Sequence, residues 1–249
     1  AKGSIENVIA SVTAASPEKT HQFVYDLSVN GTLAGLGPSR INGGSLYYNT
    51  YDITHLVKAG SNVVGAVCYA EEYRSFLCQI TVFYTDGSSE VIVNSGRDRG
   101  SWKALDANQI FGNSGVNIGV GSYYYAASQN MNGTLYPYGW NEASYWDGSW
   151  SRASAAAKLD SIGTLTPYPA DNMTRYEVPA ASVKQLSNGS YVIDLGKEIV
   201  GSLKLTLNSP SQRQITVSYG EELNEDGTVR YRMRTGNVYR ELWTLKAGS

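Results

Sequence analysis

Short runs in which apolar and polar residues alternate recur from one end of the chain to the other. Alternation with a period of two predicts half-buried β-strands, and β-branched and aromatic residues strengthen that prediction. No long run has the 3.6-residue period of an amphipathic helix. We therefore expect strands over residues 22–29, 45–51, 62–70, 76–85, 89–93, 191–195, 201–208, 214–221 and 240–245.

Turn-forming pairs stand between several of these runs. Asn30-Gly31, Asp86-Gly87 and Asp226-Gly227 each follow a predicted strand. Such pairs tolerate positive φ and close hairpins. Hairpin connections without intervening helices predict an all-β protein built of two consecutive antiparallel β-sandwich, jelly-roll-like domains.

A proline-containing stretch divides the chain. Pro167, Pro169 and Pro179 lie within about a dozen residues of one another, and proline cannot donate to a β-ladder. We expect a first domain over 1–157, an extended linker over 158–179 and a second domain over 180–249. The second domain is short and its last strand reaches the end of the sequence, so we expect it to be incomplete and the chain to be a fragment of a longer protein.

Composition narrows the function classes. The 249 residues include 20 Lys and Arg against 22 Asp and Glu, a net charge of −2, which argues against a nucleic-acid partner. No apolar run approaches the ~18 residues of a membrane span, so we expect no membrane partner. A hydrophobic content of 42% supports folded cores.

No familiar catalytic motif occurs in the chain. The two histidines, His21 and His55, are interpreted as surface or turn residues. Glycoside hydrolysis needs only two carboxyl groups, but the adjacent pairs Glu71-Glu72 and Glu221-Glu222 would point to opposite faces of a strand. Asp52 and Asp194 are candidates for capping turns. We assign no catalytic residue and no metal site.

Cys68 and Cys78 are the two cysteines. If 62–70 and 76–85 pair directly as a hairpin about Tyr73, the two residues lie opposite each other and a disulfide becomes possible in geometry. The alternative, equally favoured by the sequence, is two small buried apolar residues.

Aromatic residues are dense between 123 and 150, and amide side chains stand among them. Aromatic faces stack on sugar rings and amides bind hydroxyl groups, so this stretch is weak support for a carbohydrate-binding surface. Packing of a core and of one long loop explains each aromatic residue equally well.

Several motifs together resemble one family. YDLSVNG at 25–31, YNTYDIT at 48–54 and GSNVVG at 60–65 are similar to the opening domain of bacterial α-L-rhamnosidases of glycoside hydrolase family 78. NMNGTL at 130–135, followed by Gly139-Trp140 and Ser149-Trp150, resembles the end of that domain. YVIDLGKEIVG at 191–201 and the segments around Tyr219 and Arg234 resemble the strands that follow. The resemblance covers nearly the whole chain.

The resemblance implies two β-sandwich modules that precede an (α/α)6 barrel carrying the catalytic carboxylates. Some first domains of this kind resemble carbohydrate-binding module family 67, which binds L-rhamnose through calcium held by an acidic loop. The corresponding loop here, 37–45, has no carboxylate, and Asn132 and Thr134 stand where the family motif has Asp and Arg. Calcium usually takes carboxylate ligands. The resemblance thus allows calcium, but we predict no cofactor.

The main hypothesis is a non-catalytic N-terminal fragment of an α-L-rhamnosidase-like glycoside hydrolase, inactive by itself, whose partners are a rhamnose-containing glycan and the catalytic domain of the same polypeptide. The alternative is a stand-alone, lectin-like module that binds L-rhamnose or another glycan. A purely structural role in a surface layer or adhesin also fits. We expect a secreted, periplasmic or cell-surface location. Candidate sugar contacts on predicted loops are Arg40, Asn42, Asn132, Tyr136 and Trp140.

Overall fold

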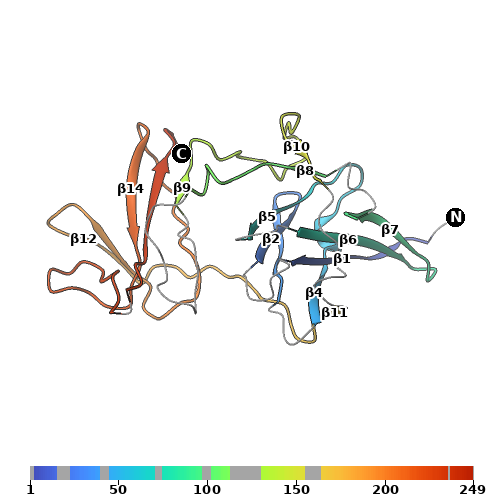
Figure 1. The fold of residues 1–249 in the computed structure, drawn as a ribbon, viewed down its shortest axis with the longest axis horizontal. Helices are drawn as coiled ribbons and strands as arrows, with labels where there is room; N and C mark the ends of the chain where they lie inside the picture. The colour runs from blue at the N-terminus through green and yellow to red at the C-terminus, as the bar shows by residue number, and fades with distance from the viewer. Residues whose placement is uncertain are drawn as a thin grey trace. The chain divides into compact units, whose positions relative to one another are not determined.

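A computed structural model describes residues 3–15, 23–39, 45–70, 75–96, 102–112, 130–154, 164–234 and 236–248. The chain forms two compact units (Figure 1). Unit 1 comprises Ala1–Leu105 and Tyr138–Arg175, and unit 2 comprises Asp106–Pro137 and Tyr176–Ser249. Within the described residues, the secondary structure is β except for one 3-10 turn, η1 (Thr54–Leu56). The predicted all-β class is confirmed.

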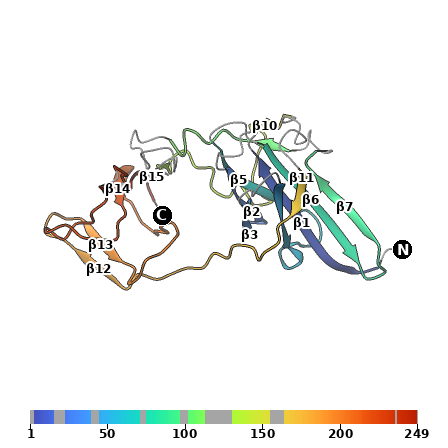
Figure 2. The same ribbon diagram turned by 60° about the horizontal axis from the view of Figure 1, so that its bottom comes forward.

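Unit 1 is a sandwich of two sheets. The larger sheet has the order β11-β4-β1-β6-β7 and the smaller the order β3-β2-β5. The strands of the larger sheet are β1 (Ile5–Ala15), β4 (Ser45–Asp52), β6 (Ser75–Tyr84), β7 (Ser89–Asn94) and β11 (Thr164–Pro167). Those of the smaller are β2 (Phe23–Val29), β3 (Thr32–Gly37) and β5 (Val64–Ala70). Figure 2 shows β1, β6 and β7 side by side.

The core of unit 1 lies between these sheets and follows the period of two. Alternate side chains of β1, β2 and β6 point inward and are almost fully buried, including Val8, Ala10, Val12, Tyr25, Leu27, Val29, Ile80 and Val82. Burial of this apolar surface is the main stabilising contribution to the sandwich.

Strand β1 was not predicted from the sequence, although it lies at the centre of the larger sheet between β4 and β6. Its inward residues include Ala10 and Ala14, whose small side chains weaken the hydrophobic signal. The pairing with β6, which runs from Ile5 opposite Tyr84 to Ala15 opposite Ser75, decides its conformation. The strand conformation of β1 therefore depends on its pairing with neighbouring strands and not on the local preference of its residues.

The predicted turns close as expected. Asn30 and Gly31 have φ of 50° and 83° and join β2 to β3. Gly87, with φ of 81°, lies in the turn between β6 and β7. Gly227, with φ of 80°, lies between the bridged residues Leu223 and Val229. Each turn uses the left-handed conformation that Asn and Gly tolerate.

Unit 2 contains a sheet of order β14-β15-β9 and the two-stranded pair β12-β13. The strands are β9 (Met131–Asn132), β12 (Ser182–Gln185), β13 (Tyr191–Asp194), β14 (Arg213–Ser218) and β15 (Arg240–Leu245). A further short pair in unit 1 joins β8 (Lys103–Ala104) to β10 (Ser151–Arg152). The strand predicted over 201–208 is wrong, because these residues pair with no strand and are mostly exposed.

The structural units differ from the predicted domain boundaries in two ways. Residues 106–137 contribute to unit 2, since β9 pairs with β15 in parallel. Residues 164–167, placed in the predicted linker, form β11 and pair in parallel with β4. Each unit is therefore built from two separate stretches of the chain, and two of the strand pairs among the described residues are parallel.

The hairpin proposed about Tyr73 is also wrong. Strand β5 pairs with β2 in the smaller sheet, whereas β6 pairs with β1 and β7 in the larger one. Cys68 and Cys78 therefore belong to opposite sheets, and both are free thiols. Cys78 is buried in the core and Cys68 is exposed. No disulfide joins them, and only Cys78 fits the alternative of a small buried apolar residue.

None of the helical turns in the described ranges has the length and hydrophobicity of a membrane-crossing segment.

Candidate functional site

The outer face of the smaller sheet of unit 1 gathers polar, apolar and aromatic side chains. Tyr25, Leu27 and Val29 of β2 point into the core, so the residues between them point outward. Opposite them on β5, the register pairs Val24 with Tyr69, Asp26 with Val67 and Ser28 with Gly65. Residues that lie directly opposite in an antiparallel pair share a face. Three cross-strand pairs therefore form one surface.

Asp26 and Arg175 form an ion pair on this surface. Arg175 Nη1 lies 3.5 Å from Asp26 Oδ2, and both side chains are about half-exposed. The second carboxylate oxygen, Oδ1, is buried and has no hydrogen-bond partner. Burial raises the pKa of Asp26, and the Arg175 guanidinium opposes that rise. Asp26 thus has one oxygen in an ion pair and one that is shielded from solvent without a hydrogen bond.

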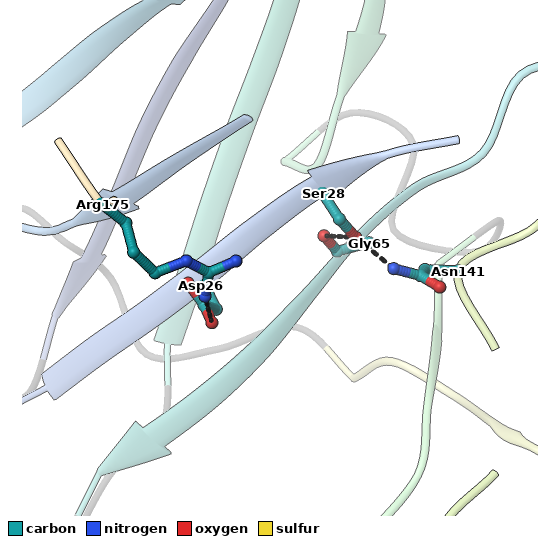
Figure 3. A network of polar contacts seen from close by, with 5 residues as sticks. All are labelled: Asp26, Ser28, Gly65, Asn141 and Arg175. Atoms are coloured by element: carbon teal, nitrogen blue, oxygen red, sulfur yellow. Dashed lines mark hydrogen bonds and ion pairs between the residues drawn. The ribbon is translucent and has the colours of Figure 1, made fainter. Parts of the chain in front are cut away.

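Ser28 marks one end of the same surface. Its hydroxyl donates to the Gly65 carbonyl at 3.3 Å and accepts a hydrogen bond from Asn141 Nδ2 at 3.2 Å. Figure 3 shows Asp26 and Ser28 on the same strand, with Arg175 and Asn141 approaching from two other segments. Segments more than 100 residues apart in the sequence therefore meet on β2.

Trp140 covers Gly65 next to this network. A Cβ atom added at Gly65 would lie 2.5 Å from Trp140 Cζ3, so only glycine allows the indole to lie there. Trp140 also stacks on Trp150 with a centroid distance of 6.3 Å, and Tyr145 meets Trp150 edge-on at 5.9 Å. The aromatic stretch noted in the sequence thus packs, in part, against the end of the outer face.

Arg175 is positioned by the segment that precedes it. Strand β11 pairs with β4, and Tyr168 N then donates to Tyr48 O at 2.9 Å. Asn172 Oδ1 accepts from Asn49 Nδ2 at 2.8 Å, and Asn172 Nδ2 donates to Thr50 O at 2.6 Å. Because Asn49 is almost fully buried, this amide pair fixes the chain three residues before Arg175.

The five predicted sugar contacts are divided between the two units and a segment outside the described residues. Trp140 belongs to unit 1, whereas Asn132 and Tyr136 belong to unit 2. Arg40 and Asn42 lie outside the described residues, as does most of the loop that the resemblance associates with calcium. Asn132 Oδ1 accepts hydrogen bonds from the Thr134 amide at 3.1 Å and hydroxyl at 2.6 Å. Tyr136 meets Phe111 edge-on at 6.3 Å.

Asp26, Ser28 and Arg175 were not selected from the sequence, and Asn141 was noted only as one of the amides among the aromatic residues. One signal was available for Asp26, which stands as a lone charge between inward apolar residues of a strand. Arg175 had no local signal, because it reaches β2 only through the packing of 164–175 on β4.

Other carboxylates of the described residues serve turns. Hydrogen bonds from Thr54 lower the pKa of Asp52, and Ser88 and Thr228 do the same for Asp86 and Asp226. Asp194 Oδ1 accepts from the Gly196 amide at 2.7 Å. The capping role expected of Asp52 and Asp194 is confirmed. Where the chain is described, no three His, Cys, Asp or Glu side chains gather in a way that suits a metal ion.

Unit 2 has a buried polar cluster of its own. Glu241 Oε2 accepts hydrogen bonds from Tyr219 Oη and Trp243 Nε1, both at 3.0 Å. Asn130 is also buried, and its Oδ1 accepts from Leu242 N at 2.7 Å while its Nδ2 donates to Gly112 O at 2.9 Å. These contacts join β14, β15 and the 106–137 segment. We interpret the cluster as structural, since its polar atoms are satisfied within the unit.

Comparison with known proteins identifies the relatives of this chain. Residues 184–246 match the bacterial α-L-rhamnosidase concanavalin-like domain. An α-L-rhamnosidase of Streptomyces avermitilis is 25% identical over 275 aligned residues, which cover 96% of this chain and 25% of that protein. The resemblance to the N-terminal region of an α-L-rhamnosidase is confirmed. This rhamnosidase-like chain spans about a quarter of the length of that curated relative.

Solved structures support the same fold. The structure of S. avermitilis α-L-rhamnosidase complexed with L-rhamnose matches 99% of this chain and 24% of its own, with a TM-score of 0.68 and 22% identity. That of the α-L-rhamnosidase from Dictyoglumus thermophilum matches 99% and 27%, with a TM-score of 0.67 and 21% identity. At these identities the likeness establishes only the architecture of the rhamnosidase-like chain. The chemistry of the chain has to be argued from its own residues.

Proposed function

We propose that this chain is the non-catalytic β-sandwich part of a longer α-L-rhamnosidase, which hydrolyses terminal α-L-rhamnosides. The observation that carries the proposal is the alignment of 96% of the chain with a quarter of an α-L-rhamnosidase. The two units would support a catalytic domain carried elsewhere on the same polypeptide, and a rhamnose-containing glycan would be the substrate of the whole protein.

The four carboxyl groups of the described residues whose pKa shifts are resolved, Asp26, Asp52, Asp86 and Asp226, support a non-catalytic role. A glycosidase needs an acid with a raised pKa and a second carboxyl group about 5–10 Å away. The pKa values of Asp52, Asp86 and Asp226 are lowered by their turn hydrogen bonds, which is the wrong direction for a general acid. Asp26 has a raised pKa but lies beside Arg175. Burial outweighs the opposing effect of the guanidinium on this pKa, but Oδ2 is paired with Arg175 and Oδ1 is buried, so neither oxygen is presented to a substrate as a proton donor.

The first test asks whether the chain belongs to a longer protein that has rhamnosidase activity. Antibodies raised against the 249-residue chain should capture a larger polypeptide from the source organism, and the captured material should hydrolyse 4-nitrophenyl α-L-rhamnopyranoside. Captured protein that has no rhamnosidase activity would overturn the proposal.

A second test addresses the non-catalytic role directly. The purified chain should release no 4-nitrophenol from the same substrate above the rate of a heat-denatured sample. Turnover by the chain alone would contradict the non-catalytic role while leaving its rhamnosidase identity in place. A stand-alone glycan-binding role is supported by no observation of its own and would gain weight only if the captured polypeptide matched this chain in mass.

A further inference from the structure

Asn-Gly pairs occupy three turns of the described residues, Asn30-Gly31, Asn132-Gly133 and Asn188-Gly189. A fourth pair, Asn42-Gly43, lies outside the described residues. In such a pair the backbone nitrogen of the glycine is close to the side-chain carbon Cγ of its own asparagine, and glycine has no Cβ to obstruct their approach. Attack of this nitrogen on Cγ releases the side-chain nitrogen as ammonia. The three turns differ in how they hold the reacting atoms, so the structure predicts different reactivities.

The side-chain carbonyl of Asn188 is polarised by two hydrogen bonds. Its Oδ1 accepts from the Ser190 amide at 2.9 Å and from the Ser190 hydroxyl at 2.6 Å. Two donors on one carbonyl oxygen stabilise the negative charge that develops there when a nucleophile adds to Cγ. Asn188 is exposed, and no described residue accepts a hydrogen bond from its Nδ2. The leaving nitrogen is therefore open to water.

The amide of Gly189, which would be the nucleophile, is held only by its own turn. Gly189 N donates to Leu186 O at 2.9 Å, and no atom lies within 4 Å of the place where a Cβ would stand. The turn closes the two-stranded pair β12-β13, whose residues are mostly exposed. A pair of only two strands is marginally stable and opens locally. The single hydrogen bond on the Gly189 amide is therefore weakly protected.

Asn132-Gly133 has the same polarised carbonyl but a firmly held amide. Asn132 Oδ1 accepts from the amide and the hydroxyl of Thr134, as Asn188 does from Ser190. Gly133 N, however, donates to Thr244 O of β15 at 2.8 Å, and Asn132 N donates to Ile110 O at 2.6 Å. These bonds belong to the β14-β15-β9 sheet and its neighbouring loop. Comparison of the two pairs thus isolates the freedom of the glycine amide.

Asn30-Gly31 is held at the side chain instead. Asn30 Nδ2 donates to Leu56 O at 2.9 Å and to Asn62 Oδ1 at 2.8 Å, and Asn30 Oδ1 accepts from Val63 N at 3.0 Å. Both the carbonyl oxygen and the leaving nitrogen are thus bound to the segment 56–63. Attack on Cγ requires these three hydrogen bonds to break, so this pair should react slowest.

We propose that Asn188 is a site of spontaneous deamidation and that it reacts faster than Asn132 and Asn30. Gly189 N gives its proton to water and bonds to Asn188 Cγ, the Cγ–Nδ2 bond breaks, and the nitrogen leaves as ammonia. Water then opens the cyclic imide at either carbonyl, which yields aspartate or isoaspartate. One water is consumed, one ammonia is released and nothing is oxidised or reduced. Both products add a negative charge to the turn, and isoaspartate also lengthens the backbone between β12 and β13.

The experiment follows deamidation of the native chain in mildly alkaline buffer by tryptic digestion and mass spectrometry. Each event adds about 1 Da to its peptide, and the aspartate and isoaspartate forms elute separately. Asn188 is the only asparagine of the tryptic peptide 185–197, and Asn30 is the only one of 20–40. We expect Asn188 to react at least about tenfold faster than Asn132 or Asn30, the effect of one hydrogen bond that need not be broken. In concentrated urea the three rates should become similar, because the folded turns that distinguish them are lost.

Two matched variants test the geometry. Ser190→Ala removes the hydroxyl bonded to Asn188 Oδ1 and should slow deamidation of Asn188 about tenfold, with the rate at Asn132 unchanged. Thr134→Ala is the control, since it removes the corresponding hydroxyl at Asn132 and should leave the rate at Asn188 unchanged. Hydrogen exchange of the Gly189 amide should be equal in the wild type and in Ser190→Ala, which verifies that the turn itself is intact.

Two results would overturn the site. If Asn132 or Asn30 reacted as fast as Asn188 in the native chain, the hydrogen bonds of the three turns would not control the reaction. If Asn188 stayed intact in the native chain while the urea-unfolded chain was converted, the β12-β13 turn would protect it. An unchanged rate in Ser190→Ala with unchanged hydrogen exchange would contradict the role of the hydroxyl. The inference does not use the proposed function, so its failure leaves the rhamnosidase proposal as it stands.

Discussion

The hydroxyl oxygens of Tyr25 and Tyr51 lie 3.0 Å apart in the core of unit 1 and connect its two sheets. Tyr51 donates its single proton to Leu36 O at 2.8 Å, so Tyr25 is the donor to Tyr51. Tyr25 Oη also lies 3.3 Å from Val12 O. Burial raises the pKa of both tyrosines. This series of hydrogen bonds fixes the two sheets relative to each other within an otherwise apolar core.

Tyr51→Phe should destabilise the chain by about 1–3 kcal/mol, because Leu36 O loses its donor inside the core. Tyr25→Phe should cost less, about 1 kcal/mol, since Tyr51 keeps its bond to Leu36. Urea unfolding of both variants and of the double variant measures these free energies of unfolding. The two effects should not add, since the residues share one hydrogen bond. If the losses in the free energy of unfolding were additive, the hydrogen bond donated by Tyr25 to Tyr51 would be contradicted.

Gly35→Ala should destabilise unit 1 by about 3 kcal/mol or more, because the new methyl group would overlap the ring of Tyr51. Gly112→Ala is a suitable control, since its Cβ would lie 3.6 Å from the nearest atom, Asn108 O. The stabilities of the two variants can be compared by thermal unfolding, monitored by circular dichroism. A Gly35→Ala protein as stable as the control would show that Tyr51 does not occupy the space beside β3.

Cys78 should be unreactive in the folded chain, because its side chain is buried in the core. Burial raises the pKa of both thiols to about 12, so the difference between them rests on access of the reagent. Cys68 is exposed and should be alkylated first. Mass spectrometry after iodoacetamide treatment should find one label on the native chain and two after denaturation without reductant. If the denatured chain took no label until it was reduced, the cysteines would be disulfide-bonded.

Asp26 should make stability fall with rising pH. Below its ordinary pKa of 3.8 the carboxyl is protonated in both the folded and the unfolded chain. The raised pKa in the folded state means that ionisation costs the folded chain more, so stability is lost as the pH rises from 3.8 through the folded value. Solvent exposure and Arg175 limit the loss to below about 1 kcal/mol. The Asp26→Asn variant should lack this part of the pH profile, as measured by urea unfolding between pH ~3.5 and ~7.

Glu241→Ala should loosen unit 2 selectively, because Tyr219 and Trp243 both lose their acceptor. We expect a loss of about 1–3 kcal/mol, and Glu241→Gln, which keeps an acceptor oxygen, should lose less. Hydrogen exchange should rise in β14 and β15 and stay unchanged in β1. Burial is the main cause of the raised pKa of Tyr219 and the Glu241 carboxylate adds to it, so the Gln variant should lower that pKa in part.

Local sequence signals were sufficient for the fold class, most of the strands and the turns. Eight of the nine predicted strand segments overlap β2, β4, β5, β6, β7, β13, β14 and β15. Period-two alternation and Asn-Gly or Asp-Gly pairs act within a few residues, so they can be recognised without knowing the partners. The motifs shared with α-L-rhamnosidases were also visible in the sequence.

Tertiary structure decided the features that depend on pairing at a distance. Strand β1 is specified by β4 and β6, and the opposite placement of Cys68 and Cys78 by which strands β5 and β6 join. The meeting of Asp26 with Arg175, 149 residues later, depends on the packing of β11 and Asn172 on β4. The sequence by itself determined where strands form, because backbone preference is local. The partner of each strand, and hence the contact between Asp26 and Arg175, is set by the burial of shared faces, which no local pattern encodes.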